Sequence, residues 1–516
     1  MPAAQLQSRL WSLEILDFLT ESQSFTSPEY VFAHDLIREV AYESILRTQR
    51  EQLHRRILTA LEKHSLGHEE DFAEALCHHA VKAQDWEKAS HYGQLASRKA
   101  LATSAYRDAT GYLEIAMDAV EKLPASLERE RRAIDLRIEA RMTFSPFGRT
   151  AEWLELCRDA EMRSEKIGDE GRRLASIAVR AAALNFYGTP YEAITAGEQA
   201  VALADKLANT TWLGFAEYGL GQAYFVAGRY RDSELLLDRA VGRFMYAPEN
   251  VPPGTTGSSL LVLCHMMKAM VYASIGEYAA SERSSQQASD LAQSNDRPYD
   301  IIAADYGRGI VKMIHGDLEE AEQALAEASF LSRENEVRLF LPLVLCALGN
   351  IHLQQGRGAL ARDNLLEAKA EAQSLGHDSG ILLASTYLAS AHAQLGDRSE
   401  GLEAARACQA GAKQKGYQAI EALAAFAEAG ILSLQGAPGA TEAITSLERT
   451  VDIASRLGTR PLLGLAKGAL ARLLVTSGRT SEARDELSQA AELFENSKMT
   501  VQLERAKAAL SKLSNF

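Results

Sequence analysis

One turn recurs along most of this sequence at intervals of 40 residues. Gly316, Gly356 and Gly396 mark three copies, since 356 − 316 and 396 − 356 both equal 40. Nine glycines follow this spacing closely: Gly148, Gly188, Gly228, Gly276, Gly316, Gly356, Gly396, Gly436 and Gly478. Self-similarity at a period of about 20–50 residues is typical of solenoids, which stack one small unit many times. The spacing therefore predicts a repeat array.

A small residue lies twelve positions after most of these glycines. Cys408 occupies that position in one repeat, and an inserted Pro438-Gly439 shifts the register of the Gly436 repeat. Alanine occupies it in the others: Ala160, Ala200, Ala240, Ala288, Ala328, Ala368 and Ala490. A small residue at a fixed offset indicates that two elements approach closely there.

Each repeat is predicted to be a pair of helices. In one repeat we expect helices over 342–355 and 359–375, because apolar residues recur there at helical spacing. Gly356 and Gly376 are expected to end them, since glycine tolerates the left-handed cap conformation. The predicted fold is all-α: a right-handed superhelical solenoid of tetratricopeptide-like hairpins with a period of about 40 residues.

The repeat array is placed at 126–516. A helical-hairpin linker without the 40-residue spacing precedes it at 66–125, and residues 1–65 form a different, winged-helix-like segment. In that segment we expect a helix from Leu6 to near Leu19, a short hairpin over 25–32 around Ser27-Pro28, and helices over 34–46 and 51–61.

One interval between turn glycines is longer than the rest, because 276 − 228 equals 48. Ala288 keeps its place twelve positions after Gly276, so the extra residues must lie between two repeats. The stretch from 246 to 259 contains three prolines and two glycines, which favour an exposed loop. We expect this loop to border the ligand groove of that repeat, although a tolerated surface insertion is the alternative.

Composition argues against some partners. The chain has 55 basic and 69 acidic residues, a formal charge of −14, whereas nucleic acids and anionic membranes bind basic surfaces. Neither is therefore expected as a partner. No run of about 18 apolar residues occurs, so no membrane span is expected. The five cysteines are dispersed and lack any C-x-x-C pattern, which favours reduced thiols in a cytoplasmic protein.

The N-terminal segment resembles a known family. The stretch from Tyr30 to Leu46, YVFAHDLIREVAYESIL, is followed by Arg50 and Leu53-His54. It is similar to the junction after the ATPase module in large bacterial signalling proteins. These combine a class III adenylate/guanylate cyclase or a similar output with a STAND-type, AAA-like ATPase and a long tetratricopeptide-like tail. The stretch from Leu457 to Leu463, followed by Ser477-Gly478-Arg479, resembles the last repeat of that family.

The chain departs from this family in what it lacks. No G-x-x-x-x-G-K-[S/T] motif that could cradle a phosphate occurs in the sequence, and we expect no cyclase domain before Met1. The resemblance implies a truncated or split C-terminal part with no enzymatic activity of its own. A winged-helix histidine can sense nucleotide phosphates in such ATPases, and His34 resembles it. Without a phosphate loop, we expect His34 to make a structural hydrogen bond instead.

No catalytic, cofactor-binding or metal-binding residue is predicted. In Cys77-His78-His79, adjacent side chains point about 100° apart on a helix, which makes a poor chelate. Gly67 interrupts the pair His64 and His68. Gly219-Leu220-Gly221 is interpreted as a helix-contact sequence and not as a nucleotide loop, because Gly221 lies seven positions before Gly228, as Gly309 and Gly349 lie before their own turns.

A partner-binding groove is predicted from the repeat register. In a right-handed solenoid of helical hairpins, the first helix of each repeat lines the concave side. Residues ten, six and three positions before a turn glycine should then face inward: Tyr218, Gln222, Phe225, Met266, Met270, Tyr306, Ile310, Met313 and Asn350. Aromatic residues and methionines form adaptable binding surfaces. The alternative is that several of them pack between neighbouring repeats.

The function expected from these features is a non-catalytic sensor or scaffold arm. It would bind a protein or small-molecule partner in the concave groove, as part of a signalling ATPase or cyclase system. One alternative is a fragment of an adenylate cyclase or ATPase that is active only with a companion chain. Another is the sensor domain of a transcription regulator, against which the lack of a helix-turn-helix after Leu510 counts.

Overall fold

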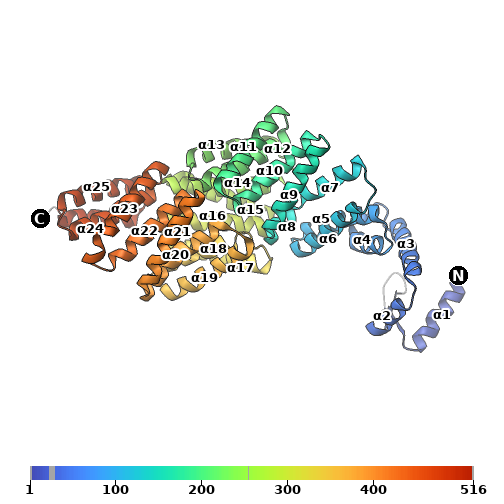
Figure 1. The fold of residues 1–516 in the computed structure, drawn as a ribbon. Coiled ribbons are helices and arrows are strands. Elements are labelled where there is room, and N and C mark those ends of the chain that lie inside the picture. Colours follow the sequence, from blue (N-terminus) through green and yellow to red (C-terminus); the bar gives the residue numbers. More distant parts are fainter. Residues whose placement is uncertain (1–2, 23–28, 254, 514–516) are drawn as a thin grey trace. The chain divides into compact units, whose positions relative to one another are not determined.

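The computed structural model describes residues 3–22, 29–253 and 255–513. The chain divides into two compact units, one of residues 1–99 with 114–123 and the other of residues 100–113 with 124–516. Helix α6 (Tyr106–Glu121) and the last residues of the helix before it, 100–102, show that the division cuts through helices: both helices contribute residues to both units. The predicted segment 1–65 falls within the first unit and the predicted array 126–516 within the second (Figure 1).

The described residues of the first unit form helices and one small hairpin. Its elements are α1 (Ala3–Ile15), β1 (Leu19–Ser22), β2 (Glu29–Phe32), α2 (Asp35–Glu43), α3 (Arg47–His64), a 3₁₀ turn (Glu69–Phe72), α4 (Ala73–Lys82) and α5 (Trp86–Ala102). The strands pair antiparallel, with Leu19 opposite Phe32. A hairpin is therefore present, but its first strand lies before the predicted range of 25–32, and only its second strand falls within that range. The predicted turn at Ser27-Pro28 lies outside the described residues. The first helix ends at Ile15 instead of near Leu19, because Asp17 adopts a left-handed φ of 58° and turns the chain into β1.

The second unit is a stack of helical hairpins. Its helices are α7 (Leu127–Glu139), α8 (Arg141–Phe147), α9 (Thr150–Lys166), α10 (Glu170–Tyr187), α11 (Pro190–Lys206), α12 (Thr210–Val226), α13 (Tyr230–Tyr246), α14 (Gly257–Ile275), α15 (Tyr278–Asn295), α16 (Pro298–His315), α17 (Leu318–Glu334), α18 (Leu341–Gln354), α19 (Gly358–Leu375), α20 (Asp378–Leu395), α21 (Arg398–Lys415), α22 (Gln418–Ser433), α23 (Ala437–Leu457), α24 (Arg460–Thr476), α25 (Thr480–Asn496) and α26 (Thr500–Leu513). Each repeat contributes two helices, as predicted, and the fold is a tetratricopeptide-like helical solenoid.

Two registers explain how the hairpins close. The seven alanines twelve positions after the turn glycines all have fully buried side chains, which confirms the predicted close contact. Glycines seven positions before the turn pack on leucines nine positions after it. A Cβ at Gly349 would lie 2.5 Å from Leu365 Cγ, and one at Gly221 would lie 3.1 Å from Leu237 Cγ. The interpretation of Gly221 as a helix-contact glycine is therefore confirmed.

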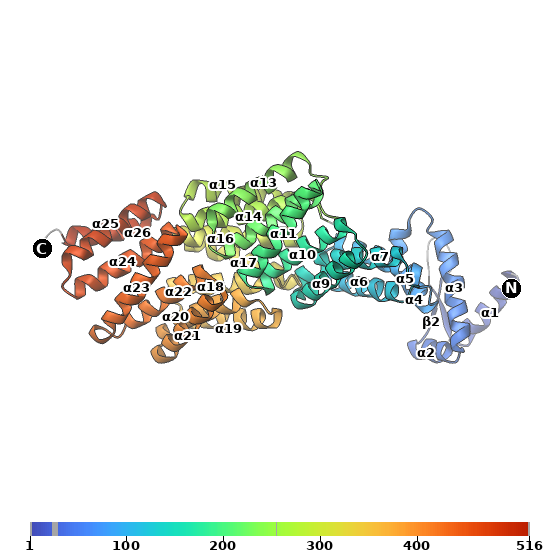
Figure 2. The same cartoon turned by 45° about the horizontal axis from the view of Figure 1, so that its top comes forward.

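The superhelix of the second unit curls far enough for late repeats to touch early ones. The backbone N–H of Arg338 donates to the carbonyl of Pro146 at 2.8 Å, and a Cβ at Gly228 would lie 2.8 Å from Leu457 Cδ2. Helix α10 contacts α20, and α14 contacts α24. Figure 2 shows the green α10–α14 region near the orange repeats. The concave side of the array is therefore closed over by its own later repeats.

Helix α14 is long and apolar enough to cross a membrane, by length and composition only. Its most apolar window is 61% buried inside the protein. The helix packs against α13, α15 and α16, and Lys268 within it forms an ion pair with Asp238 at 2.5 Å. These are features of a core helix in a repeat array.

The extra residues of the long repeat form a loop between α13 and α14, as predicted. The Arg141 guanidinium donates a 2.5 Å hydrogen bond to the carbonyl of Pro253 in this loop. The same guanidinium lies over the rings of Trp212 and Phe215, 5.7 and 5.8 Å from their centroids. Burial lowers the pKa of Arg141 to about 10. The loop is thus tied down by a buried arginine at one point.

Candidate functional site

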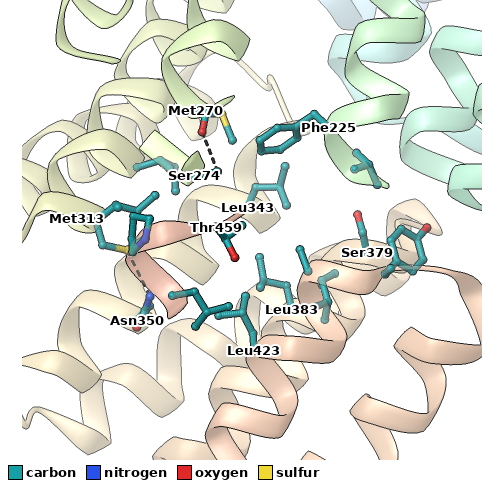
Figure 3. Close-up of a pocket in the computed structure, with 18 of the residues that line it drawn as sticks. Phe225, Met270, Ser274, Met313, Leu343, Asn350, Ser379, Leu383, Leu423 and Thr459 are labelled. Atoms are coloured by element: carbon teal, nitrogen blue, oxygen red, sulfur yellow. Dashed lines mark hydrogen bonds between the residues drawn. The ribbon is translucent and has the colours of Figure 1, made fainter. Parts of the chain in front are cut away.

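A cavity of about 540 Å³ lies inside the second unit (Figure 3). We call it the central cavity. The first helices of successive repeats line it: α10, α12, α14, α16, α18, α20, α22, α24 and α26. Sites for small molecules are typically concave and about 300–1,000 Å³ in volume. The curled superhelix therefore surrounds a partly open space of the size that a small ligand needs.

Eight of the nine predicted groove residues line the central cavity: Gln222, Phe225, Met266, Met270, Tyr306, Ile310, Met313 and Asn350. The ninth, Tyr218, does not. Its ring packs beside Phe215, with centroids 6.4 Å apart, and 7% of its surface is exposed. Tyr218 is thus buried beside a residue of its own helix, α12, and does not contribute to the cavity wall.

The sequence interpretation missed the walls that the later repeats provide. Leucines thirteen positions before the turn glycine line the cavity in four consecutive repeats: Leu343, Leu383, Leu423 and Leu465. This offset places them near the start of each first helix, about one to three turns before the predicted inward positions. The signal was visible as a repeated leucine, but its direction depends on how the superhelix closes. Figure 3 shows Phe225, Leu343, Leu383 and Leu423 surrounding the same space.

The wall of the central cavity is apolar and uncharged. It contains no aspartate, glutamate, lysine or arginine among the residues that the structure describes. Amide and hydroxyl groups are interspersed, from residues that include Asn185, Gln222, Asn350, Ser379 and Thr459. Such groups provide hydrogen bonds without charge.

The titratable groups of the wall are held neutral by burial. Desolvation lowers the pKa of His377 to about 4, so its imidazole carries no charge at pH 7. Desolvation also raises the pKa values of the Tyr306 and Tyr387 phenols. Because burying an unpaired charge costs several kcal/mol or more, a wall of this kind selects against charged ligands.

Two polar positions of the wall are fixed by neighbours. Asn350 Nδ2 lies 3.4 Å from Met313 Sδ, a contact that joins α18 to α16. Ser379 Oγ lies 3.1 Å from His377 Nε2, at the start of α20. In Figure 3 these two positions face the cavity from opposite sides. A ligand that fills the cavity can therefore meet polar groups on two sides as well as apolar side chains.

The long loop does not border the central cavity. None of its described residues, 247–253 and 255–256, belongs to the lining. Its anchor, Arg141, lies over Trp212 and Phe215, and neither of these rings lines the cavity. The expected position of the loop at the groove is therefore wrong.

His34, the cysteines and the pair His78-His79 were also considered in the sequence, and all lie outside the lining of the central cavity. His34 is the N-cap of α2, and its side chain makes no capping hydrogen bond. All five cysteines are free and buried, and burial raises the pKa of the Cys77 thiol to about 11. His78 and His79 approach a third histidine from another helix.

No protein-family model and no curated protein sequence matches the chain. Solved structures of similar fold include the Rap conjugation gene regulator of the plasmid pLS20 in complex with the Phr* peptide. It is 13% identical with a TM-score of 0.48, and the match covers 72% of this chain and 97% of that one.

Two further neighbours have the same type of fold. One is a Signal Transduction ATPase with Numerous Domains from Pyrococcus horikoshii, which carries a tetratricopeptide repeat sensor. It is 12% identical with a TM-score of 0.41, over 91% of this chain and 74% of that one. The other is NprR in complex with its cognate peptide NprX, 12% identical with a TM-score of 0.42, over 49% and 72% of the two chains. At these identities and TM-scores the likeness is one of helical-repeat fold alone.

Proposed function

We propose that the second unit is a non-catalytic sensor arm whose central cavity binds an uncharged, mainly apolar small molecule. The observation that carries this proposal is the cavity itself, about 540 Å³ in volume and without a charged side chain among its described lining residues. Apolar burial supplies affinity in such a site, and a few placed polar groups supply orientation.

The wall suits a ligand that varies in shape. Met266, Met267, Met270, Met313 and Met499 all contribute to it. Methionine is unbranched and flexible, so it can repack around different apolar groups. The cavity is therefore proposed to accept a class of related molecules.

Sensing follows from the two halves of the wall. Phe225 belongs to an early repeat, and Leu423 belongs to a late one that curls back over it. A ligand that contacts both halves binds the closed superhelix more tightly than an opened one. The ligand therefore shifts the population towards the closed form, to an extent set by the difference between its affinities for the closed and the opened forms. We propose this closure as the signal.

The arm is proposed to serve a STAND-like ATPase signalling system in the cytoplasm. The support is the resemblance of the stretch from Tyr30 to Leu46, together with the exposure of apolar side chains on it. Leu36, Val40 and Leu46 are 70%, 61% and 67% exposed, as expected if another module covers them. The free, buried cysteines fit a reducing compartment. The proposal extends to an ATPase module and does not include a cyclase.

The chain is proposed to have no ATPase or cyclase activity by itself. The support is the lack of a phosphate-binding loop in its sequence. Purified protein should show ATP turnover and cyclic nucleotide formation no higher than a blank. Turnover that a single substitution in this chain abolishes would show that the chain is an enzyme.

Ligand binding is tested with the neutral dye Nile red, whose fluorescence rises in apolar surroundings. We expect saturable binding at one site per chain, and weaker binding of the anionic dye anilinonaphthalene sulfonate. Leu383→Trp fills the cavity and should abolish the saturable signal. The matched control is Leu366→Trp on α19, where the side chain is 49% exposed, and it should bind like the wild type. Equal binding by both variants would place the dye elsewhere and overturn the proposal.

A further inference from the structure

Three histidines meet in the first unit, away from the central cavity. His54 comes from α3, and His78 and His79 come from α4. One ring nitrogen of each lies within 4.8 Å of the others. The ring centroid of His54 lies 5.8 Å from that of His78 and 5.0 Å from that of His79. The structure therefore brings together three imidazoles that the sequence separates into two places.

The packing of α3 on α4 explains this juxtaposition. His78 and His79 are adjacent on α4, so their side chains diverge and make a poor chelate by themselves. His54 is 93% buried between the two helices, and its Nδ1 lies 2.8 Å from His79 Nδ1. The third imidazole thus comes from the facing helix, into the gap between the two diverging rings.

We propose that His54, His78 and His79 form a binding site for a divalent transition-metal ion of the zinc type. Imidazole nitrogen is a preferred ligand of Zn²⁺, Cu²⁺ and Ni²⁺, and three histidines with an open fourth position form a known type of zinc site. His78 is exposed, which gives an ion a path of entry and leaves the fourth position to water or another small ligand. This site is independent of the proposed function of the cavity.

The surroundings of His54 support this assignment. Tyr42 Oη lies 3.0 Å from His54 Nε2, on the side of the ring away from Nδ1. Metal-binding histidines almost always use their second nitrogen in such an outer hydrogen bond, which fixes the ring orientation. Tyr42 therefore holds the nitrogen Nδ1 of His54 towards the other two histidines.

Binding requires a small movement. Zinc–nitrogen bonds of about 2.0–2.1 Å place two nitrogens of a tetrahedral site about 3.3 Å apart. His54 Nδ1 and His79 Nδ1 must therefore separate by about 0.5 Å and exchange their hydrogen bond for two bonds to the ion. The ion would then link α3 to α4, and it should raise the thermal stability of the first unit.

The test uses the full chain and two ions, Zn²⁺ for calorimetry and Co²⁺ for visible spectroscopy. We expect one Zn²⁺ per chain, a rise in melting temperature, and the intense absorption of tetrahedral Co²⁺. His78→Ala should weaken Zn²⁺ binding at least about tenfold without unfolding the protein, because this side chain is exposed. His68→Ala, which removes an exposed histidine outside the cluster, is the matched control and should bind like the wild type.

A second cluster of possible ligands could compete for the metal ion. His392, Asp397 and Glu400 on the second unit also have ligand atoms within 4.8 Å of one another, and Asp397 and Glu400 are exposed. Glu400→Gln should leave the binding of the first Zn²⁺ unchanged. The proposal is overturned if Glu400→Gln abolishes binding while His78→Ala does not, if His78→Ala binds like the wild type, or if no ion binds with a defined stoichiometry.

Discussion

The Tyr417 hydroxyl donates a 2.8 Å hydrogen bond to the backbone carbonyl of Gly188, 229 positions earlier in the sequence. Both residues lie in the second unit. Gly188 follows α10 and Tyr417 precedes α22, so this bond joins an early repeat to a late one. In an open solenoid each repeat contacts only its neighbours. The bond is therefore part of what closes the superhelix around the central cavity.

Tyr417→Phe should open this closure with little change elsewhere. The substitution keeps the ring, which is 98% buried, and leaves the Gly188 carbonyl without its partner. An unsatisfied buried acceptor costs about 1–3 kcal/mol. We expect a lower midpoint in chemical denaturation and weaker Nile red binding. Tyr191→Phe is the matched control, because Tyr191 is 77% exposed on the neighbouring helix α11. Equal midpoints for the two variants would show that the bond does not hold the repeats together.

Ala368→Leu tests the close contact within a repeat. Ala368 is fully buried, so a larger side chain must displace its neighbours, at a cost of about 1–3 kcal/mol. Ala359→Leu near the start of the same helix is the control, because that position is exposed, and it should be nearly neutral. The measurement is the melting temperature of each variant. Equal melting temperatures for the two variants would show that the predicted register, which places Ala368 at the close contact, is wrong.

His315 predicts a dependence of stability on pH. Both of its ring nitrogens are buried without a partner, and its ring lies 4.3 Å from that of Tyr278. Desolvation, with a smaller contribution from Lys312, lowers its pKa from 6.5 to about 4. Between these values the unfolded chain binds a proton that the folded chain does not. The free energy of unfolding therefore falls as the pH falls, by about 1.4 kcal/mol per pH unit for one such group.

His315→Phe should remove this loss. Phenylalanine keeps the contact with Tyr278 and has no nitrogen to protonate. As the pH falls from 6.5 to 4, the free energy of unfolding of the variant should rise steadily relative to that of the wild type, as measured by denaturant midpoints along a pH series. Above pH 7 the two proteins should show nearly the same pH dependence. A constant difference between the two proteins across this range would mean that His315 is not held neutral.

Local features of the second unit could be predicted from the sequence because one repeat specifies them. The turn at Gly356 and the burial of Ala368 depend only on the two helices of one hairpin. The inward direction of Phe225 and Met270 depends only on the hand of the solenoid. These relationships join residues that are close within one repeat, and the turn glycine that marks each repeat occurs nine times in the sequence.

The closure and the histidine cluster could not be predicted in this way. Closure depends on a small rotation between neighbouring repeats that accumulates over many of them, so no single repeat indicates that Tyr417 reaches Gly188. Leu383 and Leu423 were missed for the same reason. His54 meets His78 and His79 through the packing of two helices, and a search of neighbouring positions in the sequence considers only the latter two.

Arg141→Met should release the long loop without weakening the fold. The substitution removes the bond to the Pro253 carbonyl and also removes a buried cation, whose desolvation is costly. We expect faster protease cleavage within residues 247–256, at a melting temperature equal to or above that of the wild type. Since the loop does not line the cavity, Nile red binding should not change. A loss of Nile red binding in this variant would show that the loop does contribute to the ligand site.

Phe225 and Tyr218 separate the two interpretations of the predicted groove. Both lie on α12, at two of the offsets expected to face inward, but only Phe225 lines the central cavity. Phe225→Ala enlarges the cavity and removes an aromatic contact, so Nile red affinity should fall by about tenfold, which corresponds to about 1.4 kcal/mol. Tyr218→Phe removes only a hydroxyl from a residue packed away from the cavity, so affinity should stay within about twofold. Circular dichroism checks that both variants keep their helices. If Tyr218→Phe weakens binding more than Phe225→Ala does, the ligand lies deeper between α12 and its neighbours than the central cavity reaches.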